Sequence, residues 1–138
     1  MQGPLKSLLY VSRCTAPLDD DQIFRLYKTS VENNAIDGIT GVLIHDGNVF
    51  LQLLEGGDNA VTAMMARLGR DPRHCAIQVR DERVIEQRSF GTWNMKLLKI
   101  DRAHMAAVTN LEDDFGPSVA PEIRQLIIDT LHEISSAD

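Results

Sequence analysis

The sequence is poor in cysteine and in basic residues, and each shortage excludes a class of protein. It contains only two cysteines, Cys14 and Cys75, which lie far apart and form no C-x-x-C pair. They offer neither a disulfide framework nor a zinc site, and they fit a reducing, cytoplasmic environment. The 14 Lys and Arg residues are outnumbered by 20 Asp and Glu residues, which gives a net charge of −6. This charge argues against a nucleic-acid partner, because nucleic-acid binding requires clustered basic side chains.

Long apolar segments are also missing. No apolar run reaches the roughly 18 residues that a transmembrane helix needs, so no membrane partner is expected. The N-terminus lacks the basic and then apolar pattern of a signal peptide. The 138 residues, 43% of them hydrophobic and 25% charged, are most simply one globular domain that is long enough to bury a core.

Apolar periodicity and turn residues predict an α+β fold. Residues 18–34 and 58–70 have helical periodicity, and residues 39–56 are predicted to form a hairpin around Asp46-Gly47. Further strands are expected over residues 5–12, 76–84 and 93–100. The resulting order, β-α-β-β-α-β-β, predicts a ferredoxin-like arrangement with a five-stranded mixed sheet.

Two more helices are expected at the C-terminal end. Asp101 starts a short helix, and residues 121–135 form a longer one. The longer helix carries a buried-type stripe of Ile123, Ile127, Thr130 and Ile134. We therefore divide the chain into a core domain, residues 1–100, and a C-terminal helical extension, residues 101–138, which packs on the sheet or on a partner.

Polar side chains point toward the inside of the predicted sheet. Tyr10 and Ser12 lie two positions apart in an extended strand, so they share one face. In the third strand, Gln52 shares a face with Phe50 and has only apolar neighbours in the chain. A buried amide that lacks hydrogen-bond partners costs about 1–3 kcal/mol. Gln52 therefore needs partners, and Tyr10 is a candidate if the first and third strands are neighbours.

The first helix carries a stripe that starts apolar and becomes polar. Its members are Ile23, Tyr27, Ser30 and Asn34. One interpretation is that the end of the stripe simply emerges into solvent, and another is that a buried Gln belongs to a structural hydrogen-bond network. A third is that Ser30 and Asn34 converge with Tyr10 and Gln52 on a cavity for a planar, heteroatom-rich ligand.

Trp93 and Met95 alternate onto one face of the last predicted strand. Such a pair is ordinarily part of a core. A thioether and an indole beside a polar pocket also respond to a change inside that pocket.

With these residues, the chain resembles a BLUF domain, a blue-light sensor that uses flavin. The resemblance covers residues 5 to about 98, and the motifs are specific in combination rather than singly. They are Y-x-S (Tyr10, Ser12), S-x-x-N-N (Ser30, Asn33, Asn34), G-I-T-G (38–41), F-L-Q-L-L-E-G (50–56), R-D-P-R-H (70–74) and W-N-M (93–95).

The resemblance implies FAD as the cofactor, with FMN or riboflavin as alternatives, bound between the two helices of the core. It implies that Tyr10 donates an electron and a proton to the photoexcited flavin. Gln52 would lie between Tyr10 and the N5/O4 edge of the ring, and Asn34 would hold the O4/N3 edge. The other implied residues are Ser30 and Asn33 at the polar rim, Leu26, Phe50 and Leu68 on the ring, Arg67, Asp71 and Arg73 at the ribityl and phosphate part, and Ser12, Trp93 and Met95 in the signal relay.

Light would then make Gln52 rotate or tautomerise, and a new hydrogen bond to flavin O4 would shift the absorption to the red. No covalent bond to the flavin is needed, so neither cysteine has a photochemical role. His45 is assigned no role and is expected to be a solvated turn residue, and Asp37 is expected to be a turn residue.

The resemblance implies a photoreceptor without enzymatic activity. Since the residues after 100 are too few for a catalytic domain, we expect the signal to pass through protein contacts, to a homodimer or larger homo-oligomer and to a downstream regulatory protein. One alternative is a small hydrolase of the acylphosphatase type, although "RCTAPLDDD" after the first strand is acidic and would repel phosphate. Another is a light-independent oligomeric scaffold. One absorption spectrum before and after illumination distinguishes the three.

Overall fold

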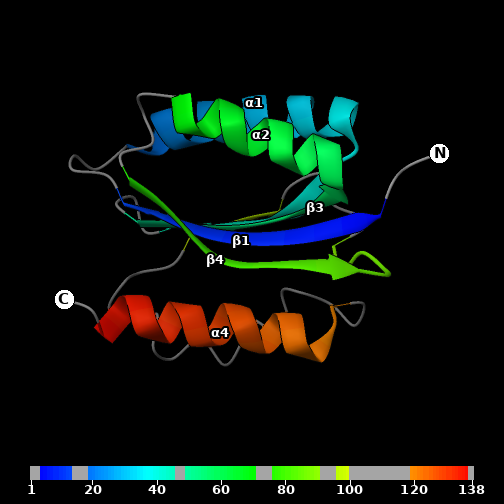
Figure 1. Cartoon of the computed structure of the whole chain (residues 1–138). Coiled ribbons are helices and arrows are strands. Elements are labelled where there is room, and N and C mark those ends of the chain that lie inside the picture. The colour runs from blue at the N-terminus through cyan, green and yellow to red at the C-terminus, as the bar shows by residue number, and fades with distance from the viewer. Residues whose placement is uncertain are drawn as a thin grey trace.

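The computed structural model describes residues 4–13, 19–45, 49–70, 76–90, 96–99 and 119–136. They form three layers, in which two helices cover one face of a β-sheet and a third helix covers the other (Figure 1). The predicted α+β class is therefore confirmed. In the described part of the chain, no helix is long and apolar enough to cross a membrane, and no group of three His, Cys, Asp or Glu side chains is placed to hold a metal ion.

The sheet has the strand order β4-β1-β3-β2-β5. Its strands are β1 (Leu5–Arg13), β2 (Thr40–His45), β3 (Val49–Gly57), β4 (Ala76–Ile85) and β5 (Lys96–Lys99). The first four form antiparallel pairs, and β5 adds to β2 in parallel. Strands β1 and β3 are neighbours at the centre of the sheet, as the inward-facing polar residues required.

Helix α1 (Asp20–Asp37) starts and ends at residues that satisfy its backbone. Asp19 caps its start and forms a capping box with Gln22, because each side chain accepts from the other residue's backbone N–H at 2.8–2.9 Å. The helix runs three residues beyond the predicted end at residue 34. It stops at Gly38, whose φ of 70° is the left-handed conformation that favours glycine.

Helices α1 and α2 (Asp58–Arg70) build one core with the sheet face below them. The bounds of α2 are those predicted. The apolar residues of this core come from alternate positions of the strands and from one side of each helix: Leu8, Tyr10, Ile23, Ile39, Leu43, Phe50, Leu54, Val61 and Met64. The predicted alternation of β3 is confirmed, since Phe50 and Leu54 belong to this core.

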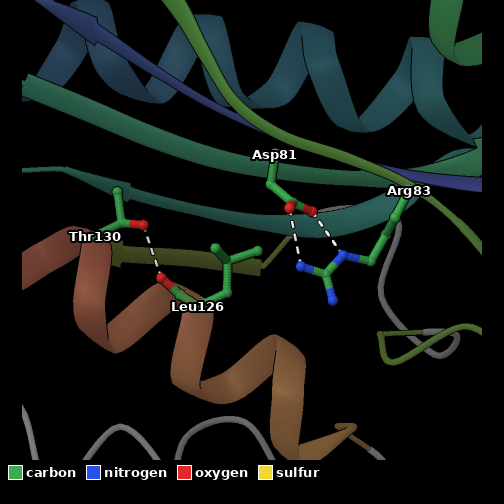
Figure 2. Close-up of polar contacts among 4 residues, drawn as sticks. All are labelled: Asp81, Arg83, Leu126 and Thr130. Atoms are coloured by element: carbon green, nitrogen blue, oxygen red, sulfur yellow. Dashed lines mark hydrogen bonds and ion pairs between the residues drawn. The ribbon is translucent and has the colours of Figure 1, made fainter.

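Helix α4 (Pro121–Ser136) covers the opposite face of the sheet. The predicted stripe is confirmed, because all four of its residues are buried. Its three isoleucines belong to one core with apolar residues of the strands: Leu9, Val11, Val42, Ile44, Val49, Leu51 and Leu53. The polar member of the stripe, Thr130, donates to the carbonyl of Leu126 at 2.7 Å (Figure 2). The shorter helix predicted from Asp101 lies outside the described residues.

Charged side chains of the edge strand β4 also contact or overlie α4. A bulge opposite Leu9 and Tyr10 interrupts the β1–β4 register, and Arg80 at this bulge binds Glu133 of α4 at 2.5 Å. Asp81 and Arg83 form a two-bonded ion pair of 2.7 and 2.9 Å on the side of β4 that faces α4 (Figure 2).

The hairpin register differs from the prediction. A two-residue turn at Asp46-Gly47 would pair His45 with Asn48, whereas the structure pairs His45 with Phe50. A shift of two residues leaves every side chain on its face, so the burial pattern does not distinguish the two registers. Pairing with β1 and the core therefore outweighs the local preference of Asp-Gly. The turn itself, residues 46–48, lies outside the described residues.

Gly41 marks the closest approach of β2 to β3. A Cβ atom there would lie 1.9 Å from the carbonyl oxygen of Leu53, and the φ of +155° is one that other residues rarely adopt. The second glycine of the G-I-T-G motif is thus required by the sheet.

We predict that Gly41→Ala lowers the free energy of unfolding by about 3 kcal/mol, because the new methyl group must push the two strands apart. Gly57→Ala is the matched control, since nothing lies within 4 Å of a Cβ at Gly57, and it should cost below about 1 kcal/mol. Urea unfolding of both variants measures the difference. Equal losses in the two variants would contradict the close approach.

Candidate functional site

The buried polar group of the sheet centres on a cross-strand pair. Tyr10 of β1 lies directly opposite Gln52 of β3, and the Tyr10 hydroxyl donates a hydrogen bond to Gln52 Oε1. Tyr10 is 1% exposed and Gln52 is 3% exposed. The sequence predicted that the Gln52 amide needs a hydrogen-bond partner. The structure shows that this partner is the Tyr10 phenol.

The pair is fixed in one hydrogen-bonding direction. Burial raises the pKa of Tyr10 well above its usual value of 10.0, so the phenol stays protonated and its O–H is the donor in the bond to Gln52 Oε1. Because the oxygen end of the Gln52 amide accepts this bond, its NH2 end is turned away from Tyr10. Loss of the phenolic proton alone would therefore favour the opposite orientation of the Gln52 amide, with its NH2 end toward Tyr10.

Asn34 and Ser12 are buried on the same side of the sheet. Asn34, in the last turn of α1, is 1% exposed, so the end of the polar stripe does not emerge into solvent as one interpretation held. Ser12 lies two residues after Tyr10 and opposite Phe50. Its hydroxyl is fully buried and has no hydrogen-bond partner among the described residues. Such a hydroxyl carries a desolvation cost that a bound polar group would remove.

Phe50 and His45 form a stacked pair beside this group. Their ring centroids are 5.7 Å apart and their planes differ by 20°. The expectation of a solvated turn histidine is wrong, because His45 is buried at the end of β2. The hairpin register explains the difference, since it places His45 directly opposite Phe50 and under the helices. The alternation of residues 40–45 places His45 on the same face as Leu43, which is a signal for burial. The polar character of the His45 side chain obscured this signal.

A groove of about 440 Å³ lies between the end of α1 and α2. Its walls include Ala60, Ala63 and Ala66, whose small side chains leave the space between the helices open. Arg67 also lines it and binds Asp37 of α1 at 2.8 Å. Asp37 is therefore the last residue of the helix and an ion-pair partner, not the turn residue expected. About half of the Arg67 side chain remains exposed, so an anionic ligand can reach it.

The structure leaves several predicted site residues undecided. Asn33 is exposed on α1 and is not brought into the buried group. Leu26 and Ser30 lie in α1 and Leu68 lies in α2, but the positions of these three side chains are outside the description. The remaining predicted residues lie outside the described residues altogether: Asp71, Arg73, Trp93 and Met95.

The chemistry of these residues fits a flavin ring. The ring needs amide-type donors and acceptors at its polar edge, and Gln52 of β3 and Asn34 of α1 are buried side chains of that type. Phe50 supplies an apolar surface, and the groove with Arg67 leads from the helices toward solvent. An oxidisable phenol in contact with the Gln52 amide adds the possibility of coupled electron and proton transfer.

Comparison with known proteins agrees with this chemistry. Residues 5–96 match the family described as sensors of blue-light using FAD. The chain is 31% identical over 92 residues to photoactivated adenylate cyclase subunit beta from Euglena gracilis. The match spans 66% of this chain and 11% of the relative's length.

Solved structures give the same likeness over most of the chain. BlrB, a BLUF protein in its dark state, is 31% identical with a TM-score of 0.70, and the match covers 94% of this chain and 99% of BlrB. BlsA in its photo-activated state is 25% identical with a TM-score of 0.64, and covers 97% and 96% of the two chains.

We predict that Tyr10 makes the protein lose stability in alkali. Because the pKa of Tyr10 is raised on folding, the unfolded chain releases its phenolic proton above about pH 10 while the folded chain keeps it. Below that pH the effect is absent. Above it, the free energy of unfolding should fall by about 1.4 kcal/mol per pH unit more in the wild type than in Tyr10→Phe. Urea unfolding across this pH range measures the slopes, and parallel slopes would contradict the buried, protonated phenol.

Proposed function

Since this chain belongs to the BLUF family, the sensors of blue light using FAD, we propose that it is a blue-light photoreceptor driven by Tyr10 and Gln52. The observation that carries the proposal is the buried hydrogen bond from the Tyr10 hydroxyl to Gln52 Oε1. It places an oxidisable group and a reversible amide in direct contact and out of water.

A bound flavin supplies the absorption of blue light and a reversible acceptor for one electron and one proton. Tyr10 gives up the electron, and the oxidised phenol releases its proton because its acidity rises sharply on oxidation. While Tyr10 lacks this proton, Gln52 Oε1 no longer faces a donor. The amide then turns its NH2 end toward Tyr10, or tautomerises, and keeps the new arrangement after the electron and proton return to Tyr10.

The exchange of donor and acceptor at Gln52 is the stored signal. After it, Gln52 presents a different hydrogen-bonding group to the O4 edge of the ring, which shifts the absorption to the red. Asn34 holds the O4/N3 edge, and its burial beside the sheet supports this assignment. Phe50 packs on the ring, together with Leu26 and Leu68.

The remaining cofactor contacts follow the family resemblance. Ser30 and Asn33 contact the polar rim, and Arg67, Asp71 and Arg73 serve the ribityl and phosphate part. The groove beside Arg67 supports its assignment, since a phosphate there would compete with Asp37 for the guanidinium. The family description makes FAD the expected flavin, although a site that grips mainly the ring would also accept FMN or riboflavin.

The output is proposed to pass through protein contacts. Ser12, Trp93 and Met95 relay the change in Gln52 to β5, and the C-terminal extension carries it to a second copy of the chain or to a regulatory protein. The chain spans about a tenth of the curated relatives it matches, which are named as cyclase subunits. Their cyclase activity is therefore not assigned to this chain, and we propose a sensor without enzymatic activity.

We predict that Gln52→Leu abolishes the reversible red shift under blue light while flavin stays bound, because leucine has no donor or acceptor to exchange. Gln78→Leu on β4 is the matched control, since Gln78 is exposed, and it should keep the full shift. Absorption spectra of both purified proteins before and after illumination give the result. A colourless wild-type protein that takes up no flavin, or a normal shift in Gln52→Leu, would contradict the proposal.

A further inference from the structure

Glu55 is a carboxylate inside the protein, on the face of β3 opposite to Gln52. Its side chain is fully buried, and its oxygens accept hydrogen bonds from Ser89 N at 2.7 Å, Phe90 N at 2.8 Å and the Thr40 hydroxyl at 3.3 Å. A buried carboxylate is tolerated only when several donors surround it. These bonds therefore fix the backbone of Ser89 and Phe90 to the central strands.

A second set of bonds strengthens the same attachment. Arg88 donates from Nη1 to the Thr40 hydroxyl and to the backbone carbonyl of Glu55, at 3.0 Å each. Burial raises the pKa of Glu55, and the hydrogen bonds from Ser89 and Phe90 act against that rise. The three residues 88–90 are thus held by β2 and β3 through a site on the face of β3 opposite to Gln52.

Ser89 connects this site to α4. Its backbone N–H binds Glu55, and its hydroxyl accepts from Ala120 N at 3.2 Å. Ala120 directly precedes α4, and its carbonyl accepts the first hydrogen bonds of that helix, from Ile123 and Arg124 at 3.1 and 3.0 Å. The start of α4 is therefore one residue away from the Glu55 carboxylate.

Apolar packing covers the same junction. Phe90, Val119 and Ile123 belong to one buried cluster under the sheet. A movement of Phe90 relative to β3 would leave a gap or a clash in this cluster, and close-packed side chains transmit such changes rather than absorb them.

The other end of the connection is the photochemical pair. Gln52 and Glu55 are three residues apart on β3, about 10 Å along an extended strand, and their side chains leave it on opposite faces. Phe90 is also three residues before Trp93 in the sequence, so Glu55 fixes the chain just before the proposed relay residues.

We propose that Glu55 is a positioning residue that couples the photosensory face of the sheet to the start of α4. It anchors residues 88–90 so that a light-induced shift of β3, or of the chain that leads into β5, reaches Ala120 through Ser89. The inference rests on the proposed function, because it assigns the route by which that light signal leaves the sheet.

Hydrogen exchange of backbone amides in the full-length, flavin-loaded protein tests this, measured in the dark and under blue light. In the wild type, illumination should change the exchange rates of Ala120, Ile123 and Arg124 at least about threefold. In Glu55→Gln, the NH2 of the amide faces one of the two N–H donors, so either Ser89 or Phe90 loses its acceptor and exchanges about tenfold faster. The light-dependent change at α4 should disappear, while the absorption shift stays.

Two further variants separate coupling from general destabilisation. Ser89→Ala removes only the acceptor for Ala120 N, so it should abolish the light response of α4 and leave the protection of Phe90 unchanged. If Glu55→Gln does not fold, Ser89→Ala still tests whether α4 is coupled to the sheet through Ser89. Glu86→Gln, at an exposed position three residues before Ser89, is the control and should behave as the wild type.

The outcomes distinguish this inference from the proposed function. A wild-type absorption shift with no light-dependent exchange at α4 would overturn the inference and leave the photoreceptor intact. So would a normal α4 response in both Glu55→Gln and Ser89→Ala. The absence of any absorption shift in the wild type would overturn the proposed function, and this inference with it.

Discussion

The proposed photochemistry depends on one hydrogen bond, from the Tyr10 phenol to the oxygen of the Gln52 amide. It exists because β1 and β3 are adjacent and in a register that places the two residues directly opposite each other. The phenol is the donor in this bond because burial keeps it protonated. A slip of one residue would send Tyr10 to the face that α4 covers and would break its contact with Gln52.

Because side chains alternate along the strands, the two faces of the sheet contact different layers. Odd and even positions of β3 face different layers, so Gln52 lies under α1 and α2 while Glu55 faces the α4 side. Strand β3 therefore contacts the core that contains Tyr10 on one face and helix α4 on the other. The route that we propose from Gln52 to α4 therefore needs only a stiff, paired strand.

The sequence predicted the parts of this molecule that depend on strong local patterns. Helix α2, the buried stripe of α4 and the faces of β3 follow from periodicity and from side-chain chemistry. It missed the features that depend on tertiary pairing. His45 is a turn residue in the sequence prediction, whereas the hairpin register places it against Phe50. The sequence gives no signal for the buried role of Glu55, because its donors Ser89 and Phe90 are far away in the chain. The predicted hairpin register is wrong because two registers bury the same side chains, so the burial pattern does not distinguish them.

The most direct measurement uses the fact that the chain has two tyrosines. In a Tyr27→Phe variant, ring-labelled tyrosine marks Tyr10 alone, and light-minus-dark infrared difference spectra then report on that residue. The account predicts label-sensitive phenol bands that appear on illumination and decay together with the red-shifted absorption. A full red shift with no label-sensitive band would show that Tyr10 takes no part in the photocycle and would contradict the account.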